Sequence, residues 1–276
     1  MRDEASAPAG SEMPACEMPA CEMPVCEMIE HLPFTTDAGI GARARIGLVV
    51  LASDYTVEHE FRRVFTIPGV DYYEARIRNS PQITPETLAA MGPLLSDTVD
   101  LILPGAKLDV VAFGCTSASM VLGEAAVAKA IHAARPDAKA TNPITAAFAA
   151  FDAFGAKRIA VLTPYRRDVN EIVRNYITGA GYEVPVFGSF NEQDDGVVAS
   201  IDGESLRAAV RAIVKGRNVD AVFVSCTSVR LVDAVCEIES ECGLPVTSSN
   251  HAMAWHCLRL AGVDEKRPEL GRLFGL

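Results

Sequence analysis

One nine-residue segment occurs twice in the chain, as DVVAFGCTS at 109–117 and as DAVFVSCTS at 220–228. Each copy has an apolar, β-branched run, then a cysteine, then Thr-Ser. A short run of this kind is typical of a strand that is buried on both faces of a parallel sheet. The hydroxyl residues that follow suit the first turn of a helix. The chain is therefore expected to contain two related strand–cysteine–helix units, with Cys115 and Cys226 in matching places.

A second pair of similar segments gives nearly the same repeat length. RIGLVVL begins at residue 45 and RIAVLTP begins at residue 158, and the two cysteines lie 111 residues apart. The two offsets indicate a duplicated unit of about 110 residues in which strands alternate with helices, as in βαβ proteins. We predict an α/β fold with two pseudo-symmetric flavodoxin-like halves, each with a four-stranded parallel sheet. Ligands of such sheets bind at the carboxyl ends of the strands, so the active site is expected in the cleft between the halves.

Hydrophobic patterning places the elements of both halves. Strands are predicted at 45–51, 70–77, 109–114 and 139–141, and again at 158–164, 184–190, 220–225 and 245–248. Helices are predicted at 55–66, 85–97, 119–134, 143–154, 167–179, 202–215, 232–241 and 250–260. The first half is expected to span 44–155 and the second 156–276, with the closing helix packed on the first half.

The N-terminal region has a different composition. Residues 13–27 read MPACE-MPACE-MPVCE, a pentad repeat with a proline in every unit and neither a helical nor a strand period. Residues 1–37 also hold eight acidic residues and one arginine. Such segments cannot bury enough apolar surface to fold. We predict that residues 1–43 are a disordered low-complexity tail.

Composition excludes several classes of function. The net charge is −11, and neither part of the chain has the basic surface that nucleic acid binding needs. No apolar run is long enough to span a membrane. The acidic N-terminus has no hydrophobic signal segment, so the eight cysteines are expected to be reduced thiols in the cytoplasm. The spacing of the cysteines matches no usual metal site, and no nucleotide-binding glycine motif occurs.

The paired cysteines are the candidates for chemistry. A thiol at the carboxyl end of a strand faces the amides and the positive dipole of the next helix, which lowers its pKa and also attracts carboxylates. Cys115 and Cys226 are then expected to flank one small acid from opposite sides. The alternative is that both are buried structural cysteines of core strands.

Longer motifs around the cysteines resemble a known group of proteins. GCTS at 114–117, LTPY at 162–165 and SCTS at 225–228 are similar to the aspartate/glutamate racemase superfamily, in the branch of maleate cis–trans isomerases and arylmalonate decarboxylases. With NEQDD at 191–195 and SSNHAMAWH at 248–256, the chain looks most similar to the ectoine-utilisation protein A type. The resemblance covers about residues 44–263.

The resemblance implies cofactor-independent chemistry at a carbon next to a carboxylate. Carried over residue by residue, it makes Cys115 the nucleophile or base and Cys226 its partner. Arylmalonate decarboxylases have glycine at the first cysteine position, so the presence of both thiols favours isomerisation or racemisation. The implied substrate-binding residues are Ser53, Asp54, Thr116, Ser117, Tyr165, Asp195, Thr227 and Ser228. No cofactor and no metal is expected.

Three functions remain open at this point. The first is an isomerase or racemase of a small amino or carboxylic acid from ectoine or hydroxyectoine breakdown. It is favoured by Asp54, at a position where maleate isomerases resemble one another in having Asn, since a carboxylate disfavours a dianion and favours an ammonium group. The alternative is a maleate cis–trans isomerase, and the non-enzyme alternative is a two-lobed protein that binds a small acid. We expect a homo-oligomer, a dimer or larger.

Removal of residues 1–28 tests the predicted tail. Because the repeat lacks the periodicity needed to pack, the truncated protein should keep the melting temperature and the activity of the full chain. Thermal unfolding and turnover of both proteins, measured side by side, check this. A drop of many degrees would show that the tail packs on the fold.

Overall fold

The structure is a computed structural model that describes residues 26–80, 82, 84–192 and 194–276. Contacts divide the chain into Met1–Asp37 and Ala38–Leu276. In the first unit, residues 26–37 are exposed and form no helix or strand. Residues 1–25 lie outside the described residues, so the disorder of the pentad repeat stays a prediction.

The described residues form two parallel sheets of four strands each, as predicted. The first has the order β2-β1-β3-β4 and the second β6-β5-β7-β8, so both have the same topology. The strands of the first sheet are β1 (Ala44–Leu51), β2 (Val70–Ile77), β3 (Val110–Gly114) and β4 (Lys139–Thr141). Those of the second are β5 (Arg158–Thr163), β6 (Glu183–Ser189), β7 (Ala221–Val224) and β8 (Val246–Ser248).

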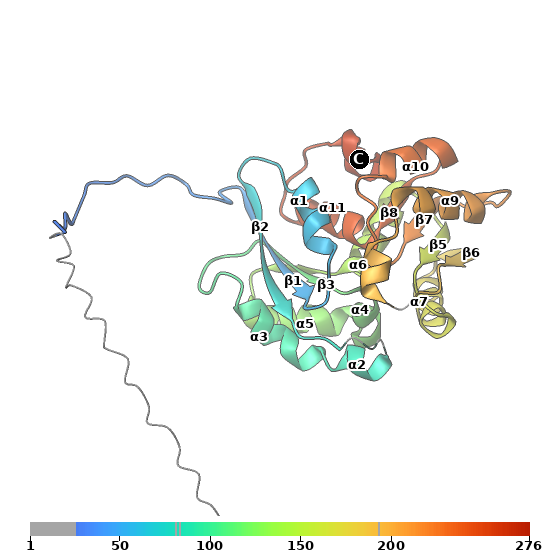
Figure 1. Cartoon of the computed structure of the whole chain (residues 1–276), viewed down its shortest axis with the longest axis horizontal. Helices are drawn as coiled ribbons and strands as arrows, with labels where there is room; N and C mark the ends of the chain where they lie inside the picture. The colour runs from blue at the N-terminus through green and yellow to red at the C-terminus, as the bar shows by residue number, and fades with distance from the viewer. Residues whose placement is uncertain (1–25, 81, 83, 193) are drawn as a thin grey trace, which may run out of the picture. The chain divides into compact units, whose positions relative to one another are not determined.

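Helices connect the strands and cover both faces of the sheets (Figure 1). In the first half of the chain they are α1 (Val57–Val64), α2 (Pro85–Ala89), α3 (Gly92–Asp100), α4 (Thr116–Leu122), α5 (Glu124–Ala134) and α6 (Pro143–Phe154). In the second half they are α7 (Arg167–Gly179), α8 (Asp195–Ala199), α9 (Gly203–Val214), α10 (Val235–Cys242) and α11 (Ser249–Leu260), followed by the short 3-10 turns Pro268–Leu270 and Arg272–Gly275. No helix in the described part of the chain is long and apolar enough to cross a membrane.

The alternation along β1 explains why both faces of the first sheet are buried. Successive side chains of a strand point to opposite faces. Leu48 and Val50 belong to the core shared with α1 and α11, whereas Val49 belongs to the core shared with α3 and α5. All three are fully buried.

Two helices pack on the sheet of the other half. Phe151 of α6 packs edge-on against Phe223 of β7, with ring centroids 5.5 Å apart. Met253 of α11 belongs to the same core as Leu48 of β1. Figure 1 shows α11 and α6 between the two sheets. Buried apolar contacts therefore join the two sheets.

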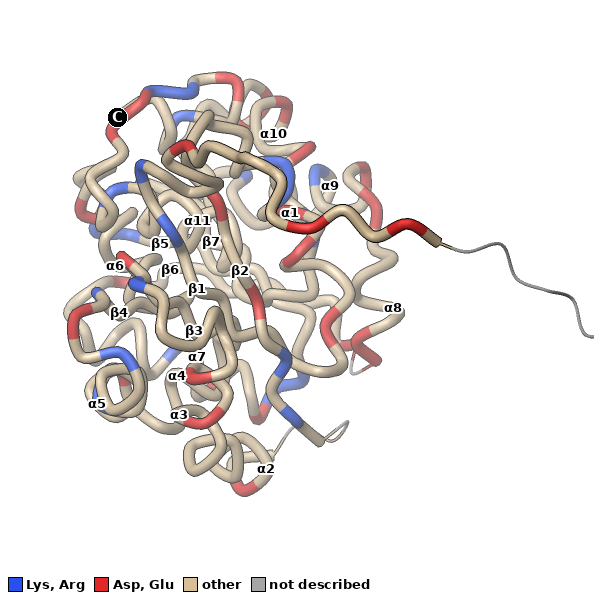
Figure 2. Tube along the Cα trace, turned by 90° about the vertical axis from the view of Figure 1, so that its left-hand side faces the viewer, with Lys and Arg blue, Asp and Glu red and all other residues tan. Residues whose placement is uncertain are grey.

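Acidic and basic residues are mixed along the described chain. In Figure 2, basic and acidic segments are interspersed along the described chain. Several of them form ion pairs between neighbouring elements, such as Arg63 with Asp233 at 2.8 Å and Arg76 with Glu58 at 2.6 Å. Exposed pairs of this kind contribute little to stability.

Two predicted helices are each broken in two, and both breaks have a local cause. The helix predicted at 85–97 divides before Pro93, because proline lacks the N–H that would continue the helix. The helix predicted at 119–134 begins earlier, at Thr116, and divides at Gly123, whose φ of 83° is outside the helical region. In addition, α8 was not predicted.

The close approach of β1 to β3 yields a test at Gly114, the residue before Cys115. A Cβ at Gly114 would lie 2.9 Å from the Val49 carbonyl oxygen, which belongs to rigid sheet backbone. Gly114→Ala should therefore destabilise the fold by about 1–3 kcal/mol, as overpacking does. The control is Gly179→Ala, where no atom lies within 4 Å of the new Cβ and φ is not positive. That variant should gain about 0.5 kcal/mol. Denaturant unfolding measures both, and equal stabilities would contradict the packing described here.

Candidate active site

Cys115 follows β3 directly and precedes the first turn of α4. Cys115 is 4% exposed, and its thiol makes no capping hydrogen bond to the first turn of α4. The Cys115 carbonyl accepts from the N–H of Ser119 at 3.1 Å and from its hydroxyl at 2.6 Å. The first turn of α4 therefore fixes the position of this cysteine.

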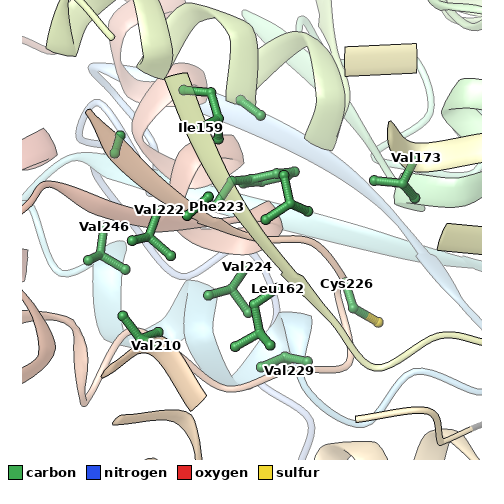
Figure 3. Packing of buried hydrophobic residues seen from close by; sticks show 14 of the residues in the cluster. Ile159, Leu162, Val173, Val210, Val222, Phe223, Val224, Cys226, Val229 and Val246 are labelled. Carbon is green, nitrogen blue, oxygen red and sulfur yellow. The ribbon is translucent and has the colours of Figure 1, made fainter. Parts of the chain in front are cut away.

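Cys226 lies two residues beyond the end of β7 and is also 4% exposed. Figure 3 shows its sulfur directed away from the packed side chains of Val224 and Leu162. The Ser228 N–H donates to the sulfur over 3.3 Å. The predicted helix N-terminus after this cysteine is wrong, however, because residues 226–234 form no α-helix and α10 begins only at Val235.

Tyr165 connects the two cysteine segments. It lies just beyond the end of β5 and is 6% exposed. Its hydroxyl is close enough to the Cys226 and Ser117 side chains for both to shift its pKa, Cys226 upward and Ser117 downward. Burial raises its pKa well above the usual range, so the phenol stays protonated and can donate to a thiolate at Cys226.

One cavity contains most of the predicted site residues. Its lining includes Cys115, Thr116, Ser117, Tyr165, Asp195, Cys226, Thr227 and Ser228. Its free volume is about 30 Å³. Since one water needs about 10–15 Å³, the cavity as it stands holds about two waters. The two cysteines of the repeated segment thus face the same small space.

The remaining lining comes from residues that the sequence analysis missed. They are Leu51, Asn79, Ser80, Gln82, Thr87, Leu88 and Met91. Asn79 and Ser80 follow the carboxyl end of β2, and the rule that ligands bind at this edge of a parallel sheet could have identified them. Leu51 ends β1 and Gln82 lies between β2 and α2. Thr87 and Leu88 belong to α2, Met91 precedes α3, and the position of these two helices depends on tertiary packing.

Ser53 and Asp54 stand beside the described lining of the cavity and are not part of it. Asp54 Oδ1 accepts from the backbone N–H groups of Thr56 at 2.7 Å and Val57 at 2.8 Å, at the start of α1. Burial raises the pKa of Asp54, and the hydrogen bonds from these two amides oppose the shift. Ser53 Oγ accepts from Asn79 at 2.8 Å. Their predicted role in substrate binding stays a prediction.

Asp195 is an acidic residue in the lining of the cavity. It begins α8 and accepts from the hydroxyls of Ser228 at 3.3 Å and Ser53 at 3.5 Å. Burial raises its pKa, although the two hydroxyls lower it. No Lys, Arg or His stands among the described lining residues. A bound carboxylate would therefore rely on backbone amides and hydroxyls.

The predicted lowering of the thiol pKa values is wrong for both cysteines. Burial raises the pKa of Cys115 to about 12 and that of Cys226 to about 11. The nearby Ala118 N–H, the Tyr165 hydroxyl and the hydrogen bond from the Ser228 N–H act in the opposite direction but do not offset the loss of water around a thiolate. Both cysteines are therefore protonated at neutral pH. No cluster of side chains suited to a metal ion occurs in the part of the chain that the structure describes.

Comparison with known proteins now identifies the family. The family model for arylmalonate decarboxylase matches residues 93–274. The chain belongs to the arylmalonate decarboxylase family. A maleate isomerase of Nocardia farcinica is 32% identical over 243 residues, which are 83% of this chain and 94% of that protein. The arylmalonate decarboxylase of Bordetella bronchiseptica is 33% identical over 136 residues, 49% of this chain and 57% of that protein.

A solved structure of the family is also similar. A Cys-to-Ser mutant of the Nocardia farcinica maleate cis–trans isomerase, with a covalently bound succinylcysteine intermediate, has 30% identity and a TM-score of 0.76. The similarity covers 84% of this chain and 98% of that one. These matches confirm the predicted branch of the racemase superfamily. They also show that the chain is an enzyme, which sets aside the non-enzyme alternative.

The raised pKa values of this family member predict how its thiols react. Below the pKa, the thiolate fraction rises tenfold with each pH unit, and only the thiolate is alkylated. Alkylation of Cys115 and Cys226 by iodoacetamide should therefore be slow at pH 7 and rise about tenfold per unit up to pH 9. Mass spectrometry of the labelled peptides measures each rate, with glutathione as the unperturbed control. Rates that level off below pH 8 would contradict the effect of burial.

Proposed function

We propose that this enzyme isomerises a small cis-unsaturated dicarboxylate of the maleate type, in a cavity between a first half at 44–155 and a second half at 156–276. The observation that carries the proposal is that Cys115 and Cys226 face one small cavity, both as thiols. The similarity to maleate isomerases over most of the chain supports it.

Binding in this proposal depends on uncharged donors. Thr116, Ser117, Thr227 and Ser228 line the cavity with the cysteines, and the backbone amides after each cysteine lie in the same segments. The hydroxyls of Thr116 and Ser228 already donate to Ser249 and Asp195, so a ligand would have to compete for them. Such donors hold carboxylates without a basic side chain, particularly where water is excluded. Because the cavity as it stands holds only about two waters, a dicarboxylate enters only if the lining residues separate.

The two thiols then have different roles. The Cys115 sulfur forms a bond to one alkene carbon, and the π electron pair takes a proton from the Cys226 thiol at the other carbon. The proton lost by Cys115 restores Cys226, and the new single bond rotates. The Cys226 sulfur then takes the proton back from the carbon while its own proton returns to the departing Cys115 sulfur, which re-forms the double bond in the trans geometry. Covalent catalysis of this kind divides one difficult step into easier ones.

A second candidate is favoured by the acidic residues near the site. Asp195 lines the cavity and Asp54 is an electrostatic neighbour of both Asp195 and Cys115. Carboxylates in such positions disfavour a dianion and favour an ammonium group. This supports the amino acid substrate and the ectoine-utilisation type that the sequence motifs suggest. In that case the two thiols act as the acid and the base of a racemase.

Replacement of each thiol tests the two-cysteine mechanism. With maleate as substrate, Cys115→Ala and Cys226→Ala should each lower kcat by at least about 10²-fold, since positioned acid–base and covalent groups contribute at least this much. Cys257→Ala is the matched control, because Cys257 is fully buried but belongs to the core of α11. It should retain wild-type turnover. Full activity of either site variant would exclude the mechanism.

The same assay separates the two candidates. The wild-type enzyme and Asp54→Asn are compared on maleate and on a panel of small amino acids. Efficient conversion of maleate by the wild type supports the main proposal. Turnover of an amino acid alone, with maleate activity appearing only in Asp54→Asn, would contradict it and support the second candidate.

A further inference from the structure

The two cysteine segments are held in place by different means. After Cys115, the hydrogen bonds within α4 fix the backbone, beginning with the N–H of Ser119 and the Cys115 carbonyl. After Cys226, the backbone is irregular until Val235. Buried backbone N–H groups need acceptors. The buried backbone N–H groups of the segment after Cys226 must therefore find acceptors outside a helix.

One buried carboxylate provides these acceptors. Glu60 lies on α1, in the other half of the chain, and is 2% exposed. Its Oε1 accepts from the backbone N–H groups of Leu231 at 2.5 Å and Val232 at 2.6 Å. Its Oε2 accepts from the Asn250 side chain at 2.8 Å. The same Asn250 amide nitrogen donates to the Thr227 carbonyl at 2.7 Å.

These contacts fix the segment on both sides of Ser228. Glu60 reaches Thr227 through Asn250 and reaches residues 231–232 directly. Thr56, one turn earlier at the start of α1, donates its hydroxyl to the Ser228 carbonyl at 2.9 Å. Ser228 in turn donates its N–H to the Cys226 sulfur. A continuous set of hydrogen bonds thus connects α1 to the reactive thiol.

We propose that Glu60 is a positioning residue that holds the segment from Cys226 to Val232 in its reactive geometry, in place of the helix that holds Cys115. The proposal rests on the function proposed above for Cys226. A carboxylate suits the role because all three groups that face it are N–H donors. Burial raises its pKa to about 7, and the hydrogen bonds from Val232, Asn250 and Leu231 act against this shift.

Replacement of Glu60 by glutamine keeps the size of the side chain and changes only its hydrogen-bonding groups. Glu60→Gln can still accept from Leu231 and Val232, but its amide nitrogen would face the donor nitrogen of Asn250. Glu60→Ala removes every acceptor. The matched controls are Glu239→Gln and Glu239→Ala. Glu239 is 4% exposed and accepts from the backbone N–H groups of Val246 and Arg272, away from the Cys226 segment.

The first two readouts need no substrate. In Glu60→Ala, amide hydrogen exchange at Leu231 and Val232 should accelerate about tenfold or more, because the local opening energy falls. Iodoacetamide labelling of Cys226 should accelerate similarly, while that of Cys115 stays unchanged. Glu60→Gln should lie between the wild type and Glu60→Ala, and it carries the test if Glu60→Ala does not fold. The Glu239 variants should leave the relative labelling of the two cysteines unchanged.

The third readout is catalytic. With maleate, kcat of Glu60→Ala should fall about 10²-fold, since small displacements of a reacting group have effects of this size, while KM changes less. Unchanged exchange and unchanged relative labelling in both Glu60 variants would overturn the proposal. If the wild type does not convert maleate, the proposed function fails, yet the exchange and labelling results still decide whether Glu60 positions the segment.

Discussion

The exclusion of water from the two thiols is the constraint on which the site depends. Cys115 and Cys226 end strands of two sheets with the same topology, and the packing that buries those strands also buries the thiols. Loss of hydration keeps both protonated, with pKa values raised to about 12 and about 11. A pair of thiols that hold their protons is suited to deliver one to a carbon atom. The Cys115 thiol must therefore lose its proton only when the substrate is bound.

The two halves share a topology but differ in how they hold their cysteines. In the first half, a helix begins directly after Cys115 and fixes it with local hydrogen bonds. In the second half, the corresponding segment is irregular and is held from outside by Glu60, Thr56 and Asn250. Both sheets thus have a strand followed by a cysteine, but only the second cysteine segment is supported by contacts from α1 and α11.

Much of the fold could be predicted because strands and their order follow from local patterns. Buried β-branched runs and the repeated offsets placed the strands to within about two residues, as expected for strong periodic signals. The strand-end rule also predicted that Cys115 and Cys226 lie near one another, and the resemblance to the racemase superfamily added Tyr165 to the site. It did not predict the irregular segment after Cys226, because the Thr-Ser that follows it is the same as after Cys115. Nor did it predict the raised thiol pKa values, which depend on burial by distant residues.

The most direct test of the account is to trap the covalent intermediate. Cys226→Ser keeps a hydroxyl that can still donate a proton but removes the thiol that takes the proton back, so a covalent adduct should form slowly and persist. The protein is incubated with maleate, digested and examined by mass spectrometry. The account predicts a peptide containing Cys115 whose mass has increased by one molecule of maleic acid, with Cys257 unmodified. Absence of an adduct on Cys115 while the variant remains folded, or an adduct distributed over the other cysteines, would contradict a paired-thiol site.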